Sequence, residues 1–122
     1  MEGWIKLYRK MTEWEWYDDI NTKVLFLHLL LTANHKDRKW KGKIIKRGQK
    51  LTSISHLARE VGLTIQNIRT SLSKLKSTNE ITVEVTHKYT LITIEKYSDY
   101  QICENEINKQ NNKRNNKQST NN

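Results

Sequence analysis

The sequence has little of what several common protein classes need. Cys103 is the only cysteine among 122 residues, which excludes an intramolecular disulfide and a zinc site of clustered cysteines. The most apolar run, residues 24–31, is interrupted by His28 and is much shorter than the roughly 20 apolar residues of a transmembrane helix. No apolar segment follows the charged residues 1–10, as a secretory signal would require. We therefore expect a protein of the reducing cytoplasm, without membrane contact.

Catalytic motifs are missing as well. The chain has no glycine-rich phosphate loop, no nucleophile elbow and no paired metal-ligand spacing. Its histidines, His28, His35, His56 and His87, are scattered along the sequence. We expect no enzymatic activity, no cofactor and no metal site.

Positive charge is abundant and concentrated in one segment. The formal net charge is +9, and residues 36–50 hold eight basic residues and one acidic residue. Lysine and arginine that neutralise phosphates supply affinity for DNA without sequence information. We interpret the segment as a phosphate-binding loop; the alternative is a solvated basic loop that Trp40 anchors to the core. The predicted phosphate contacts in this segment are Lys36, Arg38, Lys39, Lys41, Lys43, Lys46 and Arg47.

The segment that follows has the pattern of a helix-turn-helix. Residues 54–61 place apolar side chains at i, i+3, i+4 and i+7, which predicts a helix with one buried face. Gly62 is suited to end that helix, and Thr64 has the side-chain oxygen that caps a second helix over residues 64–76. The expected apolar face of the second helix comprises Ile65, Ile68, Leu72 and Leu75.

The polar face of the second helix has the side chains that read DNA. Arginine pairs with guanine, asparagine and glutamine bind adenine, and threonine or serine binds bases or phosphates. The predicted base-reading residues are Gln66, Asn67, Arg69 and Thr70, and the predicted phosphate contacts are Ser73 and Lys74.

A β-hairpin is predicted after the second helix. Apolar and polar residues alternate over residues 81–86, and residues 89–94 are rich in β-branched side chains. His87 and Lys88 lie between the two strands and are predicted to contact phosphate, the alternative being a polar turn. The whole pattern predicts an α+β fold, mainly α: a winged helix-turn-helix with a C-terminal hairpin wing over residues 1–103, followed by a disordered Asn/Lys-rich tail or linker at 104–122.

The N-terminal third is rich in aromatic and apolar residues. Residues 24–31 are apolar nearly all round, which predicts a central helix covered on several sides. Trp4, Trp14, Trp16 and Tyr17 form a candidate protein interface, for example in a dimer, although core packing is the more common use of such residues.

Several longer segments together resemble a known family. They are GWIKLYRKMTEWEWYDD, LFLHLLLTANHKDRKWKG, IKRGQKLTS, LAREVGLTIQNIRTSLSKLKSTNEITVE and YTLITIEKYSDYQ. From Gly3 to about Gln101 the chain resembles the N-terminal domain of phage DnaD-like replication proteins, also called replisome organizers. The longer members carry a second, helical domain after a polar linker, and the tail resembles the start of that linker.

The resemblance implies a function. It implies a winged helix that binds double-stranded DNA during initiation of phage or prophage replication in a bacterial host cell. It also implies self-association to a dimer or higher oligomer, and contact with the host replicative helicase or its loader. Two alternatives stay open from the residues: a phage-type transcriptional regulator with the same fold, and a winged-helix protein–protein interaction module.

Overall fold

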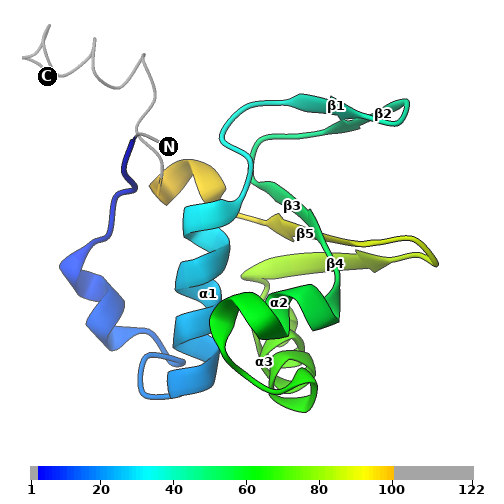
Figure 1. The fold of residues 1–122 in the computed structure, drawn as a ribbon. Coiled ribbons are helices and arrows are strands. Elements are labelled where there is room, and N and C mark those ends of the chain that lie inside the picture. Colours follow the sequence, from blue (N-terminus) through cyan, green and yellow to red (C-terminus); the bar gives the residue numbers. More distant parts are fainter. Residues whose placement is uncertain (1–2, 101–122) are drawn as a thin grey trace, which may run out of the picture.

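The computed structural model describes residues 3–100, which form a small α+β domain (Figure 1). It has three α-helices and two antiparallel sheets, as well as two short 3-10 helices. Cys103 and the predicted tail at 104–122 lie outside the described residues. The elements in chain order are η1 (Arg9–Glu13), α1 (Ile20–Thr32), β1 (Arg38–Trp40), β2 (Lys43–Ile45), β3 (Gln49–Thr52), α2 (Ile54–Val61), α3 (Ile65–Ser77), β4 (Ile81–Val85), β5 (Thr90–Ile94) and η2 (Tyr97–Tyr100).

Helix α1 lies at the centre of the packing between the N-terminal segment and helices α2 and α3. Asp19 caps it by accepting the N–H of Thr22 at 3.2 Å, and the core side includes Leu25, Phe26, Leu29 and Leu30. The predicted covering on several sides is confirmed, since α1 contacts α3 through Thr22 and Ser71, α2 through His28 and Glu60, and the N-terminal segment and η2 through Phe26. The remaining side is open, where Ile20, Val24 and Leu31 are exposed.

Helices α2 and α3 confirm the predicted helix–glycine turn–helix order. Ser53 caps α2, and Gly62 ends it in the left-handed conformation with φ of 83°. Thr64 then caps α3 by accepting the N–H of Asn67. One expected core residue is placed differently: Ile65, in the first turn of α3, is 47% exposed.

The larger sheet has the strand order β3-β5-β4. Strands β4 and β5 form the predicted hairpin, with Ile81 opposite Ile94, and β3 pairs with the other edge of β5 through Leu51 opposite Leu91. Side chains from all three helices and from the sheet meet in one core, which includes Leu29, Leu57, Ile68, Leu75 and Ile92. The sheet and helices together hold the β4–β5 hairpin so that its tip extends away from the core (Figure 1).

The basic segment is not the loop that we expected. Strands β1 and β2 pair as a two-stranded antiparallel sheet, in the register Arg38 to Ile45 and Trp40 to Lys43. Lys41 and Gly42 form its turn with φ of 47° and 78°, the positive values that suit a tight hairpin connection. Short strands rich in lysine lack the alternation that reveals a strand in sequence, and only the tertiary structure shows them.

In the part of the chain that the structure covers, every helix is too short or too polar to cross a membrane.

Candidate nucleic-acid interface

The exposed face of α3 carries most of the residues predicted to read bases. The cap made by Thr64 fixes the start of the helix, so the side chains of its first turns project from a defined position. Gln66, Arg69 and Thr70 are exposed and share one face, because they are spaced three and four residues apart. The amide of Gln66 donates a hydrogen bond of 3.3 Å to the hydroxyl of Thr70. Asn67 is half-buried at the edge of this face.

The two predicted phosphate contacts of α3 have different surroundings. Ser73 is exposed, whereas the ammonium group of Lys74 lies 2.5 Å from a carboxylate oxygen of Asp19 and 5.7 Å from the ring centre of Trp16. The hydrogen bond from Lys74 is the main cause that lowers the pKa of Asp19. The charge of Lys74 is therefore already compensated within the domain, where it joins α3 to the start of α1.

The tip of the β4–β5 hairpin is ordered by a single threonine. The hydroxyl oxygen of Thr86 accepts the backbone N–H of Lys88 at 3.2 Å and that of Tyr89 at 3.1 Å. His87 and Lys88 are both exposed at this tip. The structure thus places these two predicted phosphate contacts on a turn with a defined shape.

The β1–β2 hairpin presents most of the remaining predicted phosphate contacts to solvent. Among these residues, one acidic contact is present, between the ammonium group of Lys43 and a carboxylate oxygen of Glu84 at 3.9 Å. The other exposed cations of this stretch form no ion pair with another residue in the 3–100 range. The exposed residues are Lys36, Arg38, Lys39, Lys41, Lys43 and Lys46.

Two basic residues at the end of the segment are held by the domain. The guanidinium of Arg47 lies 5.4 Å from the ring centre of Tyr97 and donates a hydrogen bond of 3.3 Å to the hydroxyl of Ser98. The ammonium group of Lys50 lies 3.7 Å from a carboxylate oxygen of Glu60. The structure therefore separates these half-buried residues from the exposed cations of the β1–β2 hairpin.

The two hairpins are joined at one point, which the sequence did not reveal. The rings of Trp40 and Tyr89 meet edge to face, with their centres 5.6 Å apart and an angle of 88° between their planes. Lys43 donates a hydrogen bond to the hydroxyl of Tyr89, and this bond is the main cause that raises the pKa of Lys43. Trp40 thus anchors the basic hairpin to the β4–β5 tip rather than to the core. Both hairpins extend to the same side of the domain in Figure 1.

The aromatic residues of the candidate protein interface do not lie together as one exposed surface. Trp14 and Trp16 are half-buried, and their indole N–H groups donate to Glu80 at 2.8 Å and to Thr78 at 3.0 Å. Trp4 is 67% exposed, and Tyr17 is partly exposed beneath the ammonium group of Lys23. Trp14 and Trp16 therefore attach the N-terminal segment to the turn between α3 and β4.

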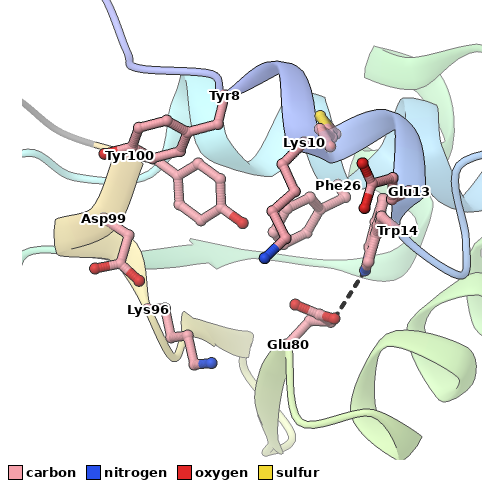
Figure 2. A pocket seen from close by; sticks show the side chains of 10 residues that line it. Tyr8, Lys10, Glu13, Trp14, Phe26, Glu80, Lys96, Asp99 and Tyr100 are labelled. Atoms are coloured by element: carbon pink, nitrogen blue, oxygen red, sulfur yellow. Dashed lines mark hydrogen bonds between the residues drawn. The ribbon is translucent and has the colours of Figure 1, made fainter.

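A groove of about 620 Å³ lies between η1 and η2 (Figure 2). Its aromatic lining is continuous, since the ring of Phe26 lies 5.0 Å from Trp14 and 5.8 Å from Tyr100 between ring centres. Burial raises the pKa of Tyr100 above its ordinary value. Lys10 and Glu13 border the groove with three other charged side chains, Glu80, Lys96 and Asp99.

No group of three or more His, Cys, Asp or Glu side chains within residues 3–100 is arranged to hold a metal ion. Comparison of the chain with protein-family models, with curated proteins and with solved structures gives no match.

Proposed function

We propose that the protein is a winged-helix protein that binds duplex DNA and acts in the initiation of phage or prophage DNA replication. The winged-helix assignment is supported by the order α2, glycine turn, α3 and β4–β5 hairpin, with β3 completing the sheet. The replication role comes from the resemblance of the sequence to phage DnaD-like proteins.

The contact between Trp40 and Tyr89, which joins the two hairpins, is the observation that carries the DNA-binding proposal. Trp40 and Tyr89 connect a hairpin rich in lysine to a second hairpin that carries His87 and Lys88 at its tip. Two basic hairpins that contact each other suit the phosphate backbone, because the contact holds their cations on one surface before DNA binds.

The proposed role of each residue in DNA binding follows from the position of its side chain. Gln66, Arg69 and Thr70 on the exposed face of α3 contact base edges in the major groove, and Asn67 contributes at the edge of that face. The exposed cations of the β1–β2 hairpin contact phosphates, as do His87 and Lys88. Lys74 has a structural role in this scheme, because Asp19 already neutralises it.

The proposal is tested by measuring the affinity of the purified chain for labelled duplex fragments of its source replicon. Unrelated duplex serves as competitor, at about 50 and about 200 mM salt. With about six phosphate contacts, affinity falls on the order of a thousandfold between these salt concentrations. Absence of binding at the lower salt concentration would refute the proposal. A preferred fragment within a replication origin supports the replication role, and one that overlaps a promoter supports a transcriptional regulator instead.

A matched pair of variants separates a DNA-binding hairpin from general attraction by positive charge. Lys39→Gln with Lys41→Gln removes two charges from the β1–β2 hairpin, and Lys10→Gln with Lys23→Gln removes two charges outside both hairpins. We expect the first variant to bind at least about tenfold more weakly than the second. Equal losses would show that only the net charge matters.

A further inference from the structure

Trp40 and Tyr89 form an aromatic pair outside the hydrophobic core. Both side chains are half-buried, and neither belongs to the core cluster of residues 3–100, which Trp14 and Trp16 do contact. Each ring lies on a hairpin that extends away from the core, on the same side of the domain (Figure 1). Aromatic rings stabilise a small domain most when they are buried in its core, so a pair on two projecting hairpins points to a binding role as well.

Lysine side chains surround the pair. The ammonium group of Lys41 lies 5.1 Å from the ring centre of Trp40, and that of Lys43 lies 4.8 Å from the ring centre of Tyr89. Within residues 3–100, Lys41 forms no ion pair, and Lys43 forms one, with Glu84 at 3.9 Å. The two rings therefore lie in a positively charged surface whose charge is only partly compensated.

The indole N–H of Trp40 has no acceptor in the described part of the chain, whereas those of Trp14 and Trp16 donate to other side chains. The contact between Trp40 and Tyr89 is edge to face, so it covers the face of one ring at most and leaves the faces of the other ring outside the contact. The pair thus retains ring surface and one hydrogen-bond donor for a ligand.

The geometry points to unpaired bases of a DNA strand as the ligand of this pair. An unpaired base presents its π-face to an aromatic ring, whereas a base inside a duplex is already stacked on its neighbours. Lys41 and Lys43 contact the phosphates that flank the stacked base, since single-strand-binding surfaces combine aromatic rings with positive charge. This inference deepens the proposed function and rests on it for the assignment of these cations to DNA phosphates.

Stacking on this pair is expected to tolerate most base sequences, because every base has a π-face. The choice of sequence then stays with the exposed face of α3, and the aromatic pair distinguishes an unpaired strand from a duplex. Phosphate contact by lysine alone makes no such distinction, because both forms of DNA carry the same backbone.

The first test compares two strands of equal charge. One is a thymine oligonucleotide of about 12 nucleotides, and the other is an abasic strand of the same length, which retains the phosphates but lacks the bases. At about 50 mM salt, we expect the full chain to bind the thymine strand about tenfold more tightly than the abasic strand. Equal affinities, or no binding of the thymine strand, would overturn the inference.

Variants of Trp40 show whether the preference comes from stacking. Trp40→Leu should reduce the ratio of the two affinities to about one, and Trp40→Phe, which retains a ring, should keep most of it. The ratio separates stacking from a displaced hairpin, because displacement weakens the binding of both strands alike. Trp4→Leu is the matched control and should keep the native ratio, since Trp4 is 67% exposed and lies outside both hairpins. A ratio that Trp40→Leu leaves unchanged contradicts the proposed site. Circular dichroism establishes that each variant is folded.

Photochemical cross-linking locates the bound base. A thymine strand that contains one iododeoxyuridine is irradiated with the full chain, and the attached peptide is identified by mass spectrometry. We expect attachment at Trp40 or Tyr89. Attachment confined to residues outside the two hairpins would show that the bases bind elsewhere.

A duplex of the same length keeps this inference separate from the proposed function. A chain that binds the duplex but does not prefer the thymine strand over the abasic strand retains the proposed function and refutes the inference. A chain that prefers the thymine strand but does not bind the duplex supports the inference and refutes the proposed duplex binding.

Discussion

The ring of Tyr89, at the tip of the β4–β5 hairpin, lies edge to face with the indole of Trp40 on the β1–β2 hairpin, although the two residues are 49 positions apart in the sequence. Neither ring carries a charge, but their contact brings the cations of the β1–β2 hairpin close to the tip of the β4–β5 hairpin. Lys43 approaches the same tyrosine, with its ammonium group 4.8 Å from the ring centre. The contact therefore gives the basic segment a fixed position relative to the rest of the domain.

Removal of the Tyr89 ring is predicted to weaken DNA binding without changing the charge of the protein. An aromatic pair contributes about 0.5–1.5 kcal/mol, so Tyr89→Ala should lower affinity about two- to tenfold if the hairpin position matters. Tyr89→Phe retains the ring but loses the hydroxyl that accepts from Lys43, and its effect should be smaller. Fluorescence anisotropy at several salt concentrations measures both variants. The salt slope should stay constant for Tyr89→Ala, whereas Lys39→Gln should reduce it by about 1. An unchanged affinity of Tyr89→Ala would show that DNA binding does not depend on the contact between Trp40 and Tyr89.

Loss of Arg69 is predicted to affect the choice of DNA sequence. Arg69 is exposed in the first half of α3, where side chains of a recognition helix reach base edges. Arg69→Ala should cost about 1–3 kcal/mol on the preferred fragment and reduce the ratio of specific to unspecific affinity. Competition with unrelated duplex measures that ratio. Lys39→Ala, on the β1–β2 hairpin, is the control and should weaken binding to all sequences alike. If Arg69→Ala changes neither affinity nor preference, α3 is not the recognition helix.

Lys74 is predicted to contribute to the stability of the fold but not to the affinity for DNA. Its ion pair with Asp19 is partly exposed, and such pairs contribute up to about 1 kcal/mol. Lys74→Gln should therefore lower the free energy of unfolding by up to about that amount and leave DNA affinity within about twofold of the native value. Urea denaturation and DNA titration measure the two effects. A large loss of DNA affinity with unchanged stability would show that Lys74 contacts phosphate after all.

Glu60 is predicted to make the domain sensitive to acid. Partial burial acts to raise its pKa, but the hydrogen bond with His28 and the nearby Lys50 and His56 outweigh it and hold the pKa below the ordinary value of 4.5. Because the folded-state pKa is the lower one, this stabilisation is complete above about pH 4.5 and disappears as the pH falls through the folded-state pKa.

Denaturant unfolding at about pH 6 and about pH 3 tests the acid sensitivity. Glu60→Gln should be less stable than the native chain at the higher pH. Its free energy of unfolding should also fall less than that of the native chain when the pH is lowered from the first value to the second. Glu95→Gln, which changes an exposed carboxylate after β5, is the matched control and should follow the native chain. Identical losses for Glu60→Gln and the native chain would contradict the prediction.

The fold was predictable where short-range interactions determine it. The bounds of α2 and α3 follow from apolar spacing, from Gly62 and from the cap of Thr64, all of which act within a few residues. The β4–β5 hairpin was likewise visible in the alternation of residues 81–85. The β1–β2 hairpin was missed, because three-residue strands of lysine and arginine look like a polar loop in sequence.

The sequence alone determined the charge of this protein, the positions of α2 and α3, and the set of basic and polar side chains that could contact DNA. Only the tertiary structure decided which of those side chains are available, because that depends on partners far away in the chain. Lys74 is neutralised by Asp19, the residue that caps α1, Lys50 lies near Glu60, and the β1–β2 hairpin is held by Tyr89. The exposure of Leu31 on the apolar helix α1 also depends on the tertiary structure. Hydropathy predicts that such a helix is buried, but it does not predict which side of the helix the rest of the fold covers.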